Sequence, residues 1–220
     1  MFPLFFKSTN VLEFCHNVSF MNFLAHLLLS GDNEGVIVGN YAGDFVKGRL
    51  TWEKTNGWNQ DYLTGVKLHR FIDSFTDSHP VVRETKRVVA LSQGKLAGIV
   101  LDIYFDYFLA RYFNYFSGES LDMYSQRMYS VFRNNEDLMP AQMVRMMHAM
   151  IDQDWLTTYA TLDGMALTFY RLSRRAAFLA PISNASTELK NSEAYYHLQF
   201  DLFFPELQAA SAQFLEENRQ

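Results

Sequence analysis

The sequence is nearly devoid of cysteine and contains no long apolar run. Its single cysteine, Cys15, excludes an intrachain disulfide and fits a reducing cytosol, so we expect a cytoplasmic protein. The most apolar stretch, residues 98–116, is interrupted by Asp102, Asp106 and Arg111, whereas a bilayer span needs roughly 20 consecutive apolar residues. The net charge of −5 argues against a general nucleic-acid binder. We therefore expect neither a membrane span nor a nucleic-acid partner.

Several motifs of well-known enzyme classes are also missing. The sequence has no Walker phosphate-binding loop, no GxSxG turn and no paired-cysteine metal motif. Nucleophilic catalysis by a serine–histidine pair therefore has no support in the sequence.

Helical periodicity runs through nearly the whole chain after Met21. Apolar residues recur at three- and four-residue steps, and turn signals such as Asn56-Gly57 and Ser117-Gly118 separate the segments. Pro80 and Pro140 stand where a first helical turn tolerates proline. We predict helices at residues 36–46, 63–75, 96–116, 121–132, 141–152, 159–173 and 186–217. Because strand alternation, repeats and long linkers are missing, the sequence predicts an all-α, compact single-domain helical bundle over residues 21–220.

The first twenty residues differ from the rest. They contain short apolar patches but lack the charged start, continuous apolar centre and small-residue cleavage site of a signal peptide. Met21 then reads like a natural start of the folded domain. We interpret residues 1–20 as an N-terminal extension outside the fold, which an upstream start codon would explain.

Acidic residues and a histidine occur at helical spacing inside apolar segments. His69, Asp73 and Asp77 are four residues apart in LHRFIDSFTDSHP, and Asp102 and Asp106 repeat the step in GIVLDIYFDYFLARYF. Residues four apart share one helix face, so each segment aligns its ionisable groups. Carboxylates among apolar side chains are costly unless a charge compensates them, and a bound cation does so. The alternative for the histidine and its neighbour is a surface pair of small energy.

Two further segments offer ligands of the same kind. Asp44 stands in VIVGNYAGDFVKG and His26 in NFLAHLLL, although the first could mark a helix end and the second a satisfied core histidine. A mixed His and carboxylate site favours Mn²⁺, Mg²⁺, Fe²⁺ or Zn²⁺ over a metal that prefers thiolates. Such an ion activates water and stabilises charge on a phosphoryl oxygen. The pattern therefore indicates a metal-dependent hydrolase.

A resemblance to a known family rests on these segments, namely MNFLAHL, GNYAGDFVKG, LHRFIDSFTDSHPVVR and LDIYFDYFLAR. They resemble the acyl carrier protein phosphodiesterase family, also called ACP hydrolyase. The resemblance continues through DQDWLTTYATLDGMALTFYRLSRR and YYHLQFDLFFPEL and covers roughly residues 21–210. The family is similar to the HD-type metal-dependent phosphohydrolases, which are helical and build a metal site from His and Asp. This chain lacks an adjacent His-Asp doublet, so the HD ligand assignments do not transfer directly.

The resemblance implies a specific reaction. Family members remove the 4′-phosphopantetheine arm from holo-acyl carrier protein by hydrolysing the phosphodiester to its serine, with water activated by a metal ion. Mn²⁺ is the expected cofactor, with Mg²⁺ or Fe²⁺ as alternatives. Carried onto this sequence, the catalytic and metal-binding candidates are Asp44, His69, Asp73 and Asp102, followed by His26, Asp77 and Asp106. Two alternatives stay open: an HD-like hydrolase of a nucleotide or other small phosphodiester, and a non-enzymatic helical binding protein.

An acidic enzyme acting on a strongly acidic carrier protein needs a local basic surface. Residues 45–90 contain eight Lys and Arg against five Asp and Glu. We predict that Arg70 and Arg83, which flank the proposed ligands, bind phosphate. The predicted partner-binding residues are Lys47, Arg49, Lys67, Lys86 and Arg87. The alternative is ordinary surface charge.

Two other features stand out near the C-terminal half. The methionines at 139, 143, 146, 147 and 150 recur at helical steps, as core packing residues do. Arg171, Arg174 and Arg175 either bind a phosphate or partner, or mark a solvated helix end.

Overall fold

The structure, a computed structural model, describes residues 23–219. The predicted extension at residues 1–20 lies outside the described residues. Over 23–219 the chain forms helices and no strand, which confirms the all-α prediction. The helices are α2 (Phe23–Leu28), α3 (Glu34–Ala42), η1 (Gly43–Phe45), α4 (Trp52–Thr55), α5 (Gln60–Ser78), α6 (Pro80–Gln93), η2 (Gly94–Leu96), α7 (Ala97–Arg111), α8 (Phe113–Ser117), α9 (Leu121–Asn134), η3 (Glu136–Leu138), α10 (Ala141–Asp152), α11 (Trp155–Thr158), α12 (Leu162–Ser173), η4 (Ala177–Asn184), α13 (Ala185–Asn191) and α14 (Glu193–Glu217).

The predicted helices agree with observed ones, but the prediction missed the 14-residue helix α6, although Pro80 was recognised as a residue that a first helical turn tolerates, and it also failed at breaks and short elements. Two long predictions are wrong in their continuity: residues 96–116 divide at Tyr112 into α7 and α8, and residues 186–217 divide at Ser192 into α13 and α14. Apolar periodicity continues across both breaks, so it gave no sign of them. The short helices α2, α4 and α11 were not predicted, because six or fewer residues carry no measurable period.

Two glycines bring α3 and α5 unusually close together. A Cβ added at Gly39 would lie 2.1 Å from the backbone oxygen of Tyr62, and one at Gly65 would lie 2.2 Å from that of Val36. Both distances are shorter than any van der Waals contact, so only glycine permits this crossing. The backbones of the two helices therefore touch, and this contact fixes how far the side chains of α3 lie from those of α5.

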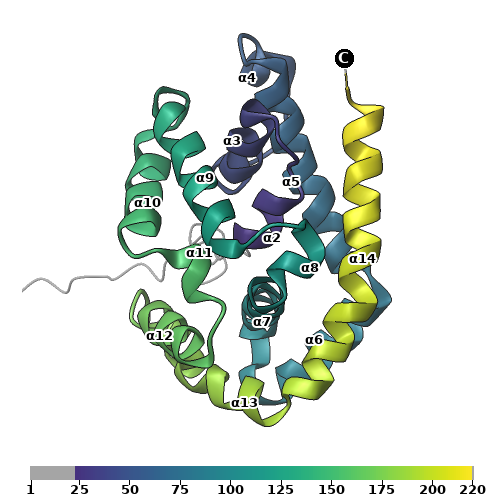
Figure 1. The fold of residues 1–220 in the computed structure, drawn as a ribbon, viewed down its shortest axis with the longest axis vertical. Coiled ribbons are helices and arrows are strands. Elements are labelled where there is room, and N and C mark those ends of the chain that lie inside the picture. Colours follow the sequence, from purple (N-terminus) through teal and green to yellow (C-terminus); the bar gives the residue numbers. More distant parts are fainter. Residues whose placement is uncertain (1–22, 220) are drawn as a thin grey trace, which may run out of the picture.

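The helix α7 forms the centre of the core. It is buried on nearly all sides despite Asp102 and Asp106, and residues such as Val100, Tyr104 and Phe108 are fully buried. The short helix α2 lies in the middle of the molecule and packs on α3 and α7, while α14 runs along one side and packs on α5, α6 and α7 (Figure 1). The expected packing role of the methionines is confirmed, since Met143, Met147 and others of the series are buried.

One described stretch, Pro80–Arg111, is apolar and long enough to cross a membrane by length and composition alone. It is not a single straight helix, because η2 separates α6 from α7 and these two helices pack against each other. Half of its apolar window is buried inside the protein, as in a core helix. The stretch is therefore weak evidence for a membrane span.

Candidate metal centre

Two histidines and an aspartate from two helices, α2 and α5, lie together, with the histidines buried and the aspartate half exposed. The carboxylate of Asp73 on α5 bridges the two imidazoles: its Oδ1 is 3.3 Å from Nε2 of His26 on α2, and its Oδ2 is 3.2 Å from Nε2 of His69 on α5. The two rings stack with centroids 4.3 Å apart, and both histidines are buried. The contact between His69 and Asp73 confirms that the two side chains share a helix face, as their spacing predicts.

A third element, η1, adds Asp44 to this group. Its Oδ1 lies 3.5 Å from Nε2 of His69. The preceding residue must be glycine, because a Cβ at Gly43 would lie 2.1 Å from Cγ of the His69 ring. The absence of a side chain there lets η1 lie directly over the imidazole and presents Asp44 to its far nitrogen.

The buried side chain of Asn40 orients both histidines, and sequence reasoning missed it. Its Oδ1 lies 2.9 Å from Nδ1 of His26 and 3.3 Å from Nδ1 of His69. Its Nδ2 donates to Ser30 Oγ and to the backbone oxygen of His26, both at 2.9 Å, so the amide oxygen must face the rings. Since a carbonyl oxygen only accepts, each Nδ1 carries a hydrogen and each neutral ring presents the Nε2 lone pair to Asp73. A polar residue inside the apolar run GVIVGNYA was the available signal.

These residues fit a divalent cation. Ligand atoms of His26, His69 and Asp73 all lie within 4.8 Å of one another, and the closest pairs are 3.2 and 3.3 Å apart. Ligands about 2.1 Å from one ion, in tetrahedral or octahedral arrangement, lie about 3.0 to 3.4 Å from each other. Nitrogen and carboxylate oxygen donors in this combination suit Mn²⁺, Fe²⁺ or Zn²⁺. The non-enzymatic alternative, buried acids paired with Arg and Lys, does not describe this group, whose partners are histidines.

The electrostatics of the group favour a positive charge between the ligands. Burial lowers the pKa of His69, but the hydrogen bonds and charges of Asp44 and Asp73 outweigh it and raise the pKa to about 9. Burial raises the pKa of Asp73, but its hydrogen bonds with His26 and His69 and their charges hold it well below its usual range. A proton on His69 therefore supplies positive charge in the metal-free protein where a cation otherwise would.

Two of the predicted acids, Asp102 and Asp77, lie beside this group and are not members of it. Burial raises the pKa of Asp102 to about 8, and the charges of Asp73, Asp77 and Asp44 add to this effect, while Lys86 opposes it. The Nζ of Lys86 is 3.5 Å from Oδ1 of Asp77. Asp102, on α7, is thus close enough to the centre for the charges there to change its pKa.

Asp106 has a different role from the ligand role that its spacing predicts. Its carboxylate accepts hydrogen bonds from the backbone N–H groups of Leu24 (3.2 Å) and Ala25 (3.1 Å). Burial raises the pKa of Asp106 well above its usual value, against these two hydrogen bonds. The spacing of Asp102 and Asp106 predicted a common ligand role, but Asp106 instead anchors the start of α2, and thereby positions His26 two residues later.

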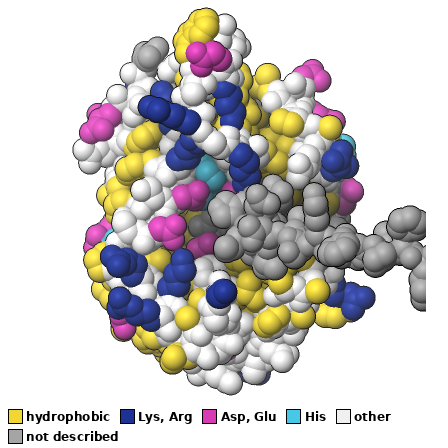
Figure 2. Space-filling model, turned by 180° about the vertical axis from the view of Figure 1, so that it is seen from behind, with side chains coloured by type: hydrophobic (Ala, Val, Ile, Leu, Met, Phe, Trp, Pro, Cys, Tyr) yellow, Lys and Arg dark blue, Asp and Glu magenta, His cyan; other side chains and the backbone are white. Residues whose placement is uncertain are grey.

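The predicted phosphate- and partner-binding residues surround the centre unevenly. Arg70 braces the loop after η1, donating to the backbone oxygens of Val46 (2.9 Å) and Gly48 (2.7 Å). The other predicted basic residues are exposed on α5, α6 and this loop, namely Lys47, Arg49, Lys67, Arg83, Lys86 and Arg87. Figure 2 shows Asp and Glu side chains gathered with a histidine near the middle of one face, and Lys and Arg side chains above and below them.

The fold and the site define an all-α protein in which two buried histidines and a half-exposed aspartate are suited to a divalent cation. The chain belongs to the acyl carrier protein phosphodiesterase family, whose family model matches residues 21–207. It is 29% identical to the acyl carrier protein phosphodiesterase of Pectobacterium atrosepticum, over 84% of this chain and 92% of that one. Identity to the enzymes of that name from Serratia proteamaculans and Escherichia coli O157:H7 is 28% (85% of this chain, 95% of that one) and 26% (87% and 98%). No solved structure matches the chain, so the similarity to HD-type enzymes stays a prediction.

Replacing Asn40 should weaken metal binding without removing a ligand. In Asn40→Ala, nothing holds the hydrogens on the two Nδ1 atoms, so either ring can place a hydrogen on Nε2, where a cation must bind. We expect Mn²⁺ to bind about 10 to 100 times more weakly by isothermal titration calorimetry. Ser30→Ala is the control, because it removes only the far partner of the amide. Wild-type affinity in a folded Asn40→Ala variant would contradict the orienting role.

The raised pKa of His69 predicts how the metal-free protein responds to pH. Its folded pKa of about 9 lies above the ordinary value of 6.5, so its stabilising contribution is complete below pH 6.5 and is lost as the pH rises through 9. We expect the free energy of unfolding, measured with urea and a chelator, to fall across this window. Asp44→Asn should flatten the fall. His148→Gln is the control, since His148 contacts Glu136 at the surface. An NMR titration giving His69 a pKa of 6.5 or lower would refute the prediction.

Proposed function

We propose that this protein hydrolyses the phosphodiester that links 4′-phosphopantetheine to a serine of holo-acyl carrier protein, in the cytoplasm. The observation that carries the proposal is the convergence of His26, His69, Asp73 and Asp44 in a member of the acyl carrier protein phosphodiesterase family. The products are apo-acyl carrier protein and free 4′-phosphopantetheine. The names of the relatives support this choice of substrate.

We propose Mn²⁺ as the cofactor, with Mg²⁺ or Fe²⁺ as alternatives. The Nε2 atoms of His26 and His69 and the carboxylates of Asp73 and Asp44 would hold it. When bound, such an ion stabilises charge on phosphoryl oxygens and lowers the pKa of a coordinated water. Asn40 keeps both imidazoles in the tautomer that binds a cation, and both imidazoles are buried.

Hydrolysis adds a hydroxyl group to phosphorus, and a proton must reach the serine oxygen that leaves. Asp102 is our candidate for handling this proton. In the metal-free protein, burial and the neighbouring carboxylates raise its pKa to about 8, and burial, the largest cause, does not depend on the cation. A carboxyl group with a raised pKa can both hold and release a proton. The charge of Lys86 lowers the pKa of Asp102, and we propose that this lysine attracts the phosphate.

The exposed basic residues around the centre form the proposed docking surface for the carrier protein. Arg87 forms a 2.6 Å surface ion pair with Glu84, and Lys47 and Arg49 lie in the loop that follows Asp44. Exposed charges of this kind mainly accelerate encounter with an oppositely charged partner. They would bring an acidic carrier protein to a site that is itself acidic.

The reaction is tested by incubating holo-acyl carrier protein with the enzyme and Mn²⁺ and weighing the carrier by mass spectrometry. The wild type should remove the arm, and Asp73→Asn should lose at least about 100-fold in turnover because an anionic ligand is gone. The matched control is Asp201→Asn, which alters the i+4 aspartate of a second pair, His197 and Asp201, on α14. The control should retain wild-type turnover.

Other outcomes of this assay separate the alternatives. An intact arm beside hydrolysis of a small phosphodiester would indicate an HD-like hydrolase of small substrates. Hydrolysis of neither substrate would indicate a binding protein. Full activity in a folded Asp73→Asn variant would remove this group of residues from the reaction.

Reversing the charges of the loop should weaken recognition of the carrier protein alone. We expect Lys47→Glu with Arg49→Glu to raise KM for holo-acyl carrier protein severalfold at low salt, and to spare hydrolysis of bis(p-nitrophenyl) phosphate. The effect should shrink in 1 M salt, where the Debye length is about 3 Å. A control pair with the same change in net charge is Arg133→Glu with Lys190→Glu, on α9 and α13. Equal effects of the two pairs would mean that docking depends on total charge and would contradict this surface.

A further inference from the structure

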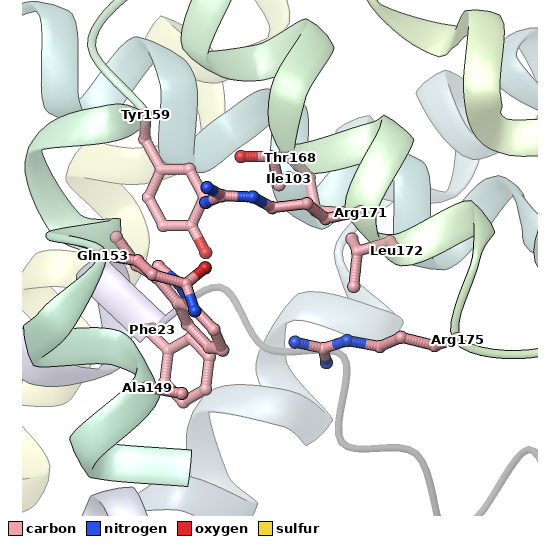
Figure 3. Close-up of a pocket in the computed structure, with 10 residues that line it drawn as sticks. Phe23, Ile103, Ala149, Gln153, Tyr159, Thr168, Arg171, Leu172 and Arg175 are labelled. Carbon is pink, nitrogen blue, oxygen red and sulfur yellow. The ribbon is translucent and has the colours of Figure 1, made fainter.

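A cavity of about 280 Å³ lies next to the metal centre, and none of the proposed ligands lines it. Its walls come from α2, α7, α10 and α12 and from the segment around α11 (Figure 3). The volume is near the lower end of the roughly 300 to 1,000 Å³ range of small-molecule sites. It therefore suits a slender ligand better than a bulky one.

The cavity starts within one helical turn of the metal centre. On α2, Phe23 lines the cavity and His26 belongs to the centre, and residues three apart lie on the same side of a helix. On α7, Ile103 lines the cavity and directly follows Asp102. A chain attached to a phosphorus at the centre would reach the cavity along α2, on the side that Phe23 and His26 share.

The lining combines an apolar floor with hydrogen-bond donors. Phe23, Ile103 and Trp155 supply the floor. Figure 3 shows the guanidinium groups of Arg171 and Arg175 directed into the cavity from the α12 side. The guanidinium of Arg175 lies 5.4 Å from the centre of the Trp155 ring, and burial lowers the pKa of Arg175. Such a lining suits a ligand that alternates alkyl segments with carbonyl acceptors.

We propose that this cavity binds the pantetheine arm of the substrate, an inference that rests on the proposed function. The dimethyl and methylene groups of the arm would contact the floor, and its two amide carbonyls would accept hydrogen bonds from Arg171 and Arg175. The same assignment gives the arginines near the end of α12 separate roles. Arg174, by contrast, stacks on the exposed Tyr170 ring at 5.7 Å and does not line the cavity.

The test measures binding of pantetheine and hydrolysis of holo-acyl carrier protein in the full-length protein. Ala149→Phe fills the cavity, Arg171→Ala removes a donor, and Arg174→Ala is the matched control outside it. In a background with Trp52 and Trp58 changed to Phe, Trp155 is the sole tryptophan and reports occupancy by its fluorescence. We expect the first two variants to weaken pantetheine binding at least tenfold and to raise KM for holo-acyl carrier protein similarly. Hydrolysis of bis(p-nitrophenyl) phosphate and all properties of the control should stay within twofold of the wild type.

The possible failures are distinguishable. If the wild type removes the arm but the cavity variants keep wild-type KM and pantetheine affinity, the cavity proposal is overturned and the proposed function stands. If inorganic phosphate changes the Trp155 signal and pantetheine does not, the two arginines bind an anion and the cavity proposal again fails. If the wild type binds pantetheine here but leaves holo-acyl carrier protein intact, the proposed function fails and the cavity remains a pantetheine site.

Discussion

The amide oxygen of Asn40, shared by two imidazoles, is the contact on which the site depends. Without it, His26 and His69 would be two adjacent buried rings with no fixed tautomer and no defined direction for their lone pairs. The hydrogen bonds from the Asn40 amide nitrogen, to Ser30 and to the backbone of His26, keep the amide from turning over. Each hydrogen bond in this network restricts the orientation of the next group, and a buried polar group left without its partner costs free energy. The two imidazoles are therefore held in one orientation before a cation binds.

The surrounding fold serves this arrangement through two other constraints. Asp106 provides acceptors for the first backbone N–H groups of α2, a helix too short to be stable by itself, and so fixes the position of His26. Gly43 lets η1 lie against the ring of His69. In both cases a residue outside the four proposed ligands determines where one of those ligands lies.

The sequence predicted the all-α class and most long helices, because their apolar periodicity is local. It also predicted the shared face of His69 and Asp73, which follows from four-residue spacing within one helix. It ranked His26 below Asp102, whereas His26 belongs to the closest group and Asp102 lies beside it. Contacts between separate helices decide that order, and no pattern along the chain contains them. For the same reason the roles of Asn40 and Asp106 and the existence of the cavity became visible only in three dimensions.

The close crossing of α3 and α5 makes the distances within the site less sensitive to amino-acid substitutions in the core. Side-chain packing between helices alters whenever a core residue is replaced, and the distance between the helices alters with it. At Gly39 and Gly65 the helices meet backbone to backbone, and a backbone has no alternative rotamers and no size that substitution elsewhere can change. The separation of Asn40 from His69 is thereby insulated from the composition of the core. A chain that kept these two glycines could then change much of its interior without a shift in the spacing of this site.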